Sequence, residues 1–122
     1  MRYLVEALRA LGNPERLRLF FLLGWQGDGL CVCELVEALD LPQYQVSKHL
    51  RVLRRTGLIE STRVGRWAYY SVAGSPRAHE LSDFLQAVVP HSEVSTALKR
   101  LQASISRREG GRCVEWRNTG RV

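Results

Sequence analysis

Cysteine, histidine and long apolar runs are scarce in this sequence, and each scarcity argues against a class of protein. The 122 residues include three cysteines and three histidines. An odd number of cysteines does not supply the paired framework of a small disulfide-rich secreted protein, so we expect reduced thiols in the cytoplasm. No apolar run approaches the roughly 18 residues of a membrane-spanning helix, so no membrane partner is expected. The first residues mix charged and apolar side chains, unlike a signal peptide.

Catalytic groupings are missing as well. The histidines are scattered, and no serine or cysteine motif accompanies them that would pair a nucleophile with a base. With 45% hydrophobic and 25% charged residues, the composition is that of an ordinary globular protein. We expect a single non-enzymatic domain over residues 1–109, followed by a flexible C-terminal tail over residues 110–122.

Acidic residues are nearly absent from residues 43–72, where basic residues gather. This stretch has six Lys or Arg against one Glu, a net charge of +5, whereas residues 1–42 have four against six, a net charge of −2. The whole chain has a net charge of +6 and a pI near 9.8. Such a concentration of positive charge is the electrostatic footprint expected of a protein that binds nucleic acid.

Two short amphipathic helices joined by Leu41 and Pro42 are predicted in the same region. Their apolar faces comprise Val32, Leu35, Val36 and Leu39 in the first, and Val46, Leu50 and Leu53 in the second. The opposite face of the second carries Tyr44, Lys48, Arg51 and Arg55, with Ser47 and His49 at its edges. Pro42 disfavours continuation of the first helix and suits the start of the second. Two short helices, the second basic on its outer face, are typical of a helix-turn-helix motif.

A β-hairpin is predicted directly after this motif. Residues 58–64 and 66–72 are rich in β-branched and aromatic residues, and Gly65 marks the turn between them. Arg63 and Arg66 flank that turn. A helix-turn-helix motif followed by a hairpin with arginines at its tip predicts a winged helix, within a mainly α-helical α+β fold.

Further amphipathic helices are predicted on both sides of the winged helix. One covers residues 2–11, another starts at Asn13 and Pro14, a third follows Pro76, and Ser92 can cap the last after Pro90. A winged helix closes its own core with fewer apolar faces than these. The surplus predicts a homodimer, whose two-fold symmetry would present two recognition helices to near-palindromic double-stranded DNA.

Cys31 and Cys33 form a short dithiol at the start of the first helix of the motif. Residues i and i+2 of a regular helix point about 200° apart, so both sulfurs can hold one ion only where the first turn is distorted. Ion binding would then act on the backbone of a DNA-binding motif, which is a physical route to a switch. Two thiolates select soft ions such as As(III), Sb(III), Cd(II), Pb(II), Cu(I) or Zn(II).

Residues 8–72, and more loosely residues up to about 101, resemble the ArsR/SmtB family of winged-helix metal-sensing repressors. The resemblance rests on ALGNPERLR at residues 10–18, SKHL and LRRTGL within residues 47–58, and GRWAYY at residues 65–70. It implies a homodimeric transcriptional repressor that binds operator DNA. Cys-Val-Cys-Glu-Leu at residues 31–35 resembles the arsenic-responsive branch, whose motif has a third cysteine where this chain has Val36.

Because the motif lacks its third cysteine, the sequence does not identify the third donor to a bound ion. Candidates are Cys113 of either subunit, a small thiol or water. The resemblance implies As(III) or Sb(III) as the inducer, with Cd(II), Pb(II) or Zn(II) as alternatives, and no cofactor for DNA binding itself. The family's other metal site is not expected, because its spacing is not met by His79, Asp83, His91 and Glu93.

The second helix of the motif should enter the major groove, and the hairpin should reach phosphate or an adjacent groove. The expected contacts are Gln43, Tyr44, Ser47, Lys48 and His49 in the major groove, and Arg51, Arg63 and Arg66 on phosphate or the minor groove. The leading hypothesis is a repressor released from its operator when a thiophilic ion binds Cys31 and Cys33. The alternative is a redox sensor of the same fold, whose signal is oxidation of the dithiol. A thiol reductase is disfavoured because such enzymes use Cys-x-x-Cys.

Overall fold

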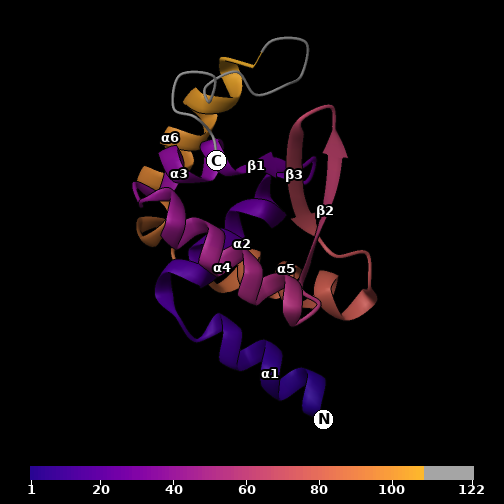
Figure 1. Ribbon diagram of the computed structural model, residues 1–122. Coiled ribbons are helices and arrows are strands. Elements are labelled where there is room, and N and C mark those ends of the chain that lie inside the picture. The colour runs from indigo at the N-terminus through magenta and orange to yellow at the C-terminus, as the bar shows by residue number, and fades with distance from the viewer. Residues whose placement is uncertain (109–122) are drawn as a thin grey trace.

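The computed structural model describes residues 1–108, which form a bundle of helices with a small sheet at one side (Figure 1). The helices are α1 (Arg2–Leu11), α2 (Pro14–Gln26), α3 (Val32–Leu39), α4 (Gln43–Arg55), α5 (Pro76–Val88) and α6 (Ser95–Ser106), with the short 3₁₀ helix η1 (His91–Glu93) before α6. The strands are β1 (Leu30–Cys31), β2 (Ile59–Val64) and β3 (Trp67–Val72). Helices α3 and α4 followed by the β2–β3 hairpin confirm the predicted winged helix-turn-helix fold.

The helix ends follow the capping residues in the sequence. The Asn13 side chain accepts a hydrogen bond of 3.0 Å from the backbone N–H of Arg16, and the Ser75 hydroxyl accepts one of 3.2 Å from Ala78. In α2 and α5 a proline follows the cap, where its missing N–H costs nothing. Helix α2 ends at Gln26 and is capped by Gly27, whose φ of 81° belongs to the left-handed region that glycine tolerates.

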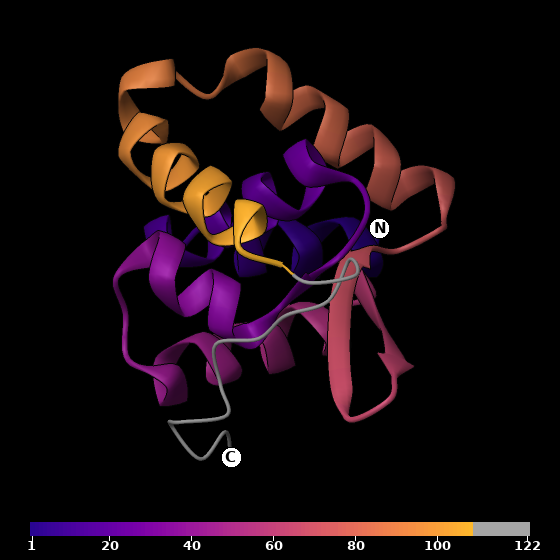
Figure 2. The same cartoon turned by 90° about the horizontal axis from the view of Figure 1, so that it is seen from above.

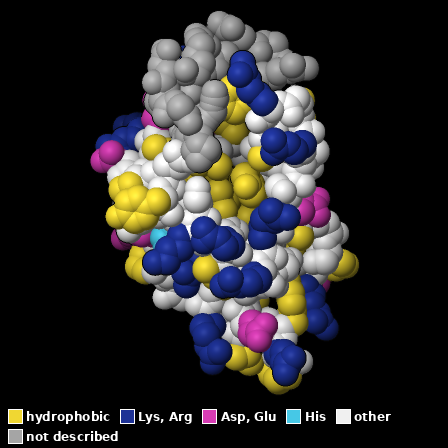
Figure 3. Space-filling model, viewed as in Figure 1, with side chains coloured by type: hydrophobic (Ala, Val, Ile, Leu, Met, Phe, Trp, Pro, Cys, Tyr) yellow, Lys and Arg dark blue, Asp and Glu magenta, His cyan; other side chains and the backbone are white. Residues whose placement is uncertain are grey.

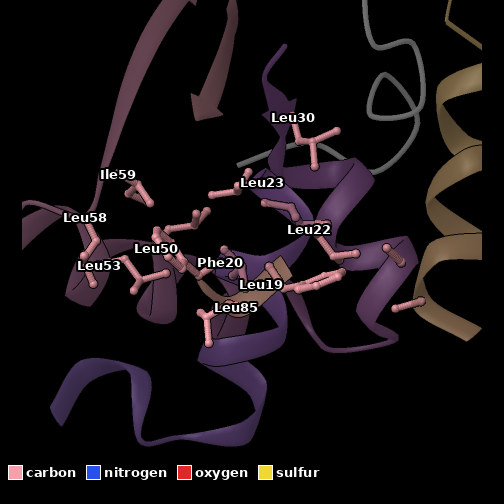
Figure 4. Close-up of a cluster of buried hydrophobic side chains, with 14 of the residues drawn as sticks. Leu19, Phe20, Leu22, Leu23, Leu30, Leu50, Leu53, Leu58, Ile59 and Leu85 are labelled. Atoms are coloured by element: carbon pink, nitrogen blue, oxygen red, sulfur yellow. The ribbon is translucent and has the colours of Figure 1, made fainter. Parts of the chain in front are cut away.

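The core is built around α2, as its heavily apolar sequence predicts. Leu19, Phe20, Leu22 and Leu23 are at most 1% exposed. Figure 4 shows these α2 side chains among Leu50 and Leu53 of α4, Leu85 of α5, and Leu58 and Ile59 at the start of the hairpin. Burial of the apolar face of α4 against α2 leaves the basic face of α4 directed outward, which is the orientation that the helix-turn-helix prediction requires.

Within residues 1–108 the sheet contains three strands in the order β1-β3-β2, all antiparallel to their neighbours. Strands β2 and β3 are joined by the predicted turn, in which Gly65 has a φ of 62°. Strand β1 was not predicted, because two residues are too short to show an alternating pattern. Its pairing places Leu30 opposite Tyr70 and Cys31 opposite Tyr69, so the first cysteine lies in the sheet that carries the wing.

The C-terminal part differs from the prediction at one helix start. Ser92 does not cap α6, because it lies inside η1, where Glu93 N–H donates to the Pro90 carbonyl at 2.9 Å. Helix α6 instead begins after Val94, which is buried at 2% exposure. Residues 109–122, including the predicted tail and Cys113, lie outside the described residues. Within the described part of the chain, no helix is both long enough and apolar enough to cross a membrane.

Candidate DNA-binding surface and dithiol site

The outer face of α4 is exposed and basic. Tyr44 is 73% exposed, and Lys48, Arg51, Arg54 and Arg55 are also exposed. Figure 3 shows Lys and Arg side chains gathered across the middle of this face, over α4 as placed in Figure 1. Between α4 and β3 the surface is hollowed, and the hollow is lined by Ser47, Leu50, Arg51, Arg54, Arg55 and Tyr70. A basic hollow beside the exposed face of a helix suits a phosphate backbone.

The hairpin tip adds two more cations. Arg63 lies at the end of β2 and Arg66 in the turn, and both are exposed. The Arg66 guanidinium carbon lies 5.9 Å from the ring centroid of Trp67, which places the cation over the ring. Both predicted wing arginines therefore lie at the tip of the β2–β3 hairpin, and Figure 2 shows this hairpin projecting from the helices.

The predicted groove-facing residues of α4 divide into two groups. Tyr44 and Lys48 are exposed and Gln43 and Ser47 are half-buried, so all four keep access to solvent. His49 differs from the prediction, because it is only 6% exposed and its Nε2 lies 2.9 Å from Oε1 of Glu15 in α2. Its imidazole is therefore held between α4 and α2, away from the outer face of α4.

The two sulfur atoms of the Cys-x-Cys pair lie close together. Sγ of Cys31 is 2.9 Å from Sγ of Cys33, and the residues are 2% and 4% exposed. Cys31 is the residue before α3 and has an extended backbone, with φ −92° and ψ 168°. The departure from helical geometry required at the first turn is thus present, because Cys31 belongs to β1. With metal–sulfur bonds of about 2.3 Å, one soft ion can reach both sulfurs.

The pair packs between the helix-turn-helix motif and the wing strand. Its apolar neighbours are Val32 and Val36 of α3 and Trp67 and Tyr69 of β3. Val36 stands where a third cysteine would complete the arsenic-type motif. In residues 1–108, no group of three or more His, Cys, Asp or Glu side chains is placed to hold a metal ion. The two sulfurs fit a soft ion as a pair, and Cys113 lies outside the described residues.

A buried ion pair beside the cysteines was not predicted from the sequence. Glu34 is 0% exposed, and its Oε1 accepts a hydrogen bond of 3.1 Å from the backbone N–H of Cys31. Arg108 donates to both carboxylate oxygens, from Nε at 2.5 Å and from Nη2 at 2.6 Å. The hydrogen bond to Glu34 raises the pKa of Arg108, so this guanidinium stays charged throughout the neutral range. An acid three residues after a helix cap is a recognisable signal for Glu34, but no local signal marks Arg108.

Comparison with known proteins identifies the family. Residues 11–62 match a family model described as a helix-turn-helix domain. The chain is 32% identical to the arsenical resistance operon repressor of Bacillus subtilis over 72 residues, which are 59% of this chain and 68% of the relative. The chain belongs to the ArsR/SmtB family of transcriptional repressors.

Other ArsR/SmtB relatives agree with this assignment. The SmtB homolog of Synechocystis, a transcriptional repressor, is 41% identical over 86 residues, covering 68% of this chain and 64% of the relative. The homodimeric winged helix-turn-helix domain of a possible ArsR-family regulator from Mycobacterium bovis superposes with a TM-score of 0.63 at 26% identity, covering 75% of this chain and 82% of that one. These relatives are regulators, not enzymes. The chain spans between about half and three quarters of the length of four of the curated relatives that it matches, from 48% to 74%.

Proposed function

We propose that this ArsR/SmtB repressor binds a near-palindromic operator as a homodimer and is released when a thiophilic ion binds Cys31 and Cys33. One observation carries the proposal: the two sulfurs lie 2.9 Å apart at a point where α3 meets the wing strand β3. An ion bound there touches both DNA-binding elements at once. The ion supplies soft Lewis-acid coordination to sulfur, and this chain supplies the geometry.

The proposed DNA contacts follow from exposure. Helix α4 lies in the major groove with Gln43, Tyr44, Ser47 and Lys48 toward the bases, while Arg51, Arg63 and Arg66 contact phosphate or the minor groove. His49 acts differently, because its buried bond to Glu15 orients α4 on α2 and leaves base contacts to the neighbouring side chains. The homodimer is supported by the homodimeric Mycobacterium bovis relative. Two copies of α4 related by a two-fold axis fit half-sites about 34–36 Å apart.

Ion binding is proposed to act on the DNA-binding elements through the pairing of β1 with β3. Cys31 pairs with Tyr69 in β3, and Trp67, which also packs on the cysteines, is the next residue after Arg66 at the wing tip. Coordination of both sulfurs by one ion would change their geometry, and this would move β1 relative to β3 and to the first turn of α3. The wing and the helix-turn-helix motif then leave the relative positions that fit the two grooves.

As(III) or Sb(III) is the proposed inducer, with Cd(II), Pb(II) and Zn(II) as the alternatives. The Cys-Val-Cys-Glu-Leu segment and the arsenical repressor among the relatives support a metalloid. The similarity to an SmtB homolog is the reason for retaining divalent ions as alternative inducers. Cys113, a small thiol or water remains the proposed source of a third donor.

Serine variants of the two cysteines test the proposal. Cys31→Ser and Cys33→Ser should bind a duplex selected from random DNA as the wild type does, because serine nearly preserves shape. Neither should be released by arsenite, antimonite or Cd(II), because a hydroxyl is a poor ligand for soft ions. Fluorescence anisotropy of labelled DNA with reduced protein measures both properties. Release of a Cys31→Ser/Cys33→Ser double variant by arsenite would refute the ion site, and absence of specific DNA selection would refute the repressor function.

Redox sensing is the second candidate, favoured by the same short distance between two buried sulfurs. Oxidation would change the sulfur geometry without an ion. Parallel titrations with peroxide and with arsenite separate the two signals, since each should release DNA only under its own hypothesis. Cys113→Ser in the same assay, with X-ray absorption counting sulfur neighbours of bound arsenic, tests Cys113 as third donor: three should fall to two if Cys113 binds.

A further inference from the structure

The buried carboxylate of Glu34 lies one residue from Cys33 and is held in place by Arg108. A carboxylate with 0% exposure is stable in the charged form only when cations and N–H groups replace its lost water. Arg108 meets this need with two charge-assisted hydrogen bonds to the two oxygens, and its own side chain is only 13% exposed. The neighbouring Arg107 pairs with Glu37 instead, and both of those side chains are more than a third exposed.

The position of Glu34 in turn determines the position of Cys31. Oε1 of Glu34 accepts both the backbone N–H of Cys31 and Nη2 of Arg108. The guanidinium therefore fixes the oxygen that holds the Cys31 backbone in its extended conformation. That conformation is what brings the Cys31 sulfur to the Cys33 sulfur, because two residues spaced i and i+2 inside a regular helix would diverge.

Arg108 also contacts the residues on either side of the turn that contains Cys31 and Cys33. Its Nη2 donates to the carbonyl of Gly29 at 2.9 Å, and its guanidinium carbon lies 5.6 Å from the ring centroid of Tyr69. Gly29 precedes β1, Glu34 lies in the first turn of α3, and Tyr69 is the partner of Cys31 in β3. One side chain beyond the end of α6 thus contacts all three segments that surround the cysteine pair.

We propose that Arg108 is a positioning residue for ion binding, a role that rests on the function proposed for Cys31 and Cys33. By fixing Glu34 against the Cys31 N–H, it assembles the two sulfurs into one binding site before the ion arrives. Ion affinity therefore depends on a contact made by a residue 77 positions away from Cys31 in sequence (108 − 31), contributed by the segment that follows α6.

Cadmium titration of charge-matched variants tests the proposal. Cd(II) binding to reduced protein is followed by absorption of the cadmium–thiolate bonds. Arg108→Gln should weaken Cd(II) binding by about 10- to 100-fold, the usual effect of removing a residue that orients a ligand. Arg107→Gln removes the same charge from the adjacent position and should bind Cd(II) as the wild type does. DNA affinity without the ion should stay unchanged in Arg107→Gln.

Comparison of Glu34→Gln with Arg108→Gln distinguishes positioning from a direct effect of charge on the bound ion. If the two side chains acted only as charges beside a divalent cation, Arg108→Gln would bind Cd(II) more tightly and Glu34→Gln would bind it more weakly. Positioning predicts weaker binding by both variants, because the pairing of Glu34 with Arg108 is lost in each. Arg108→Lys should also bind weakly, since it keeps the charge but loses the two-pronged geometry.

A double variant keeps the test valid if Arg108→Gln alone unfolds by stranding a buried charge. Glu34→Gln/Arg108→Gln leaves no unpaired charge and should bind Cd(II) as weakly as either single variant, because both changes remove one contact. Wild-type affinity in the double variant, or tighter binding by Arg108→Gln, would overturn the positioning role. Failure of the wild-type protein to bind Cd(II), arsenite and antimonite would instead refute the proposed ion site, and this inference with it.

Discussion

At the scale of single residues, His49 lies at the boundary between the buried face of α4 and the exposed face proposed to contact DNA. Its neighbours Lys48 and Arg51 are exposed on α4, whereas His49 is buried against α2 and bound to Glu15. On a helical projection His49 lies at the edge of the apolar face, so the sequence pattern does not decide between solvent and core. The partner that decides it is 34 residues earlier in the chain.

His49→Ala should therefore act first on stability. Loss of a buried side chain and of its bond to Glu15 should lower the free energy of unfolding by about 1–3 kcal/mol. Tyr44→Ala, on the exposed face of the same helix, should change stability by less than about 0.5 kcal/mol and weaken specific DNA binding. Urea unfolding and DNA anisotropy measure the two effects. If His49→Ala kept full stability yet lost sequence discrimination, His49 would contact bases after all.

At the scale of elements, the packing of α2 on α5 depends on the absence of a side chain at Gly24. A Cβ atom added there would lie 2.1 Å from the Ser82 hydroxyl and 3.1 Å from Nε2 of Gln86. Gln86 donates from that nitrogen to the Phe21 carbonyl at 3.0 Å, which ties the two helices together. Glycine inside a helix costs about 0.5–1 kcal/mol relative to alanine, and the close approach of α5 offsets that cost.

Gly24→Ala should consequently destabilise the protein by about 1–3 kcal/mol, although alanine favours helix formation. Removing the obstructing hydroxyl supplies the control, because Ser82→Ala clears the atom nearest to the new methyl group. The double variant Gly24→Ala/Ser82→Ala should recover most of the lost stability in urea unfolding. A double variant no more stable than Gly24→Ala would show that the clash with Ser82 is not the cause.

How far each element could be predicted follows from the range of the interactions that form it. Helices and the hairpin depend on local periodicity, caps and the turn at Gly65, so the sequence pattern was sufficient for them. Strand β1 exists only because it pairs with β3, about 38 residues later (Cys31 opposite Tyr69). The sulfur pair was therefore predicted as a site, while the extended turn that assembles it was stated only as a requirement. The contact of Arg108 with Glu34, 74 residues apart, has no counterpart in any local pattern.

At the scale of the whole molecule, apolar side chains remain exposed on two helices after the core is closed. On α1, Leu4, Val5 and Leu8 are 45%, 41% and 54% exposed, and on α5 Phe84 and Val88 are 59% and 50% exposed. The guanidinium carbon of Arg77 at the start of α5 lies 5.3 Å from the ring centroid of Tyr3 in α1, so the two helices meet there. Large apolar side chains exposed on neighbouring elements are typical of an interaction surface, and a second copy of the chain is the expected occupant, because a winged helix-turn-helix relative is homodimeric.

Charge substitutions on these helices should therefore dissociate the dimer. In a two-fold interface each substitution occurs twice, and loss of one buried Leu or Phe contact costs about 1.5–3 kcal/mol. Leu8→Glu or Phe84→Glu should thus raise the dimer dissociation constant by about 100-fold or more, because each 1.4 kcal/mol is about tenfold. Sedimentation at micromolar concentration should show two chains for the wild type and for Tyr44→Glu, a control on α4 that is more exposed than either residue. It should show one chain for the α1 and α5 variants. The monomeric variants should also lose affinity for a two-half-site duplex, since each then engages a single half-site. A Leu8→Glu/Phe84→Glu protein that stayed dimeric would place the interface on another face of the fold.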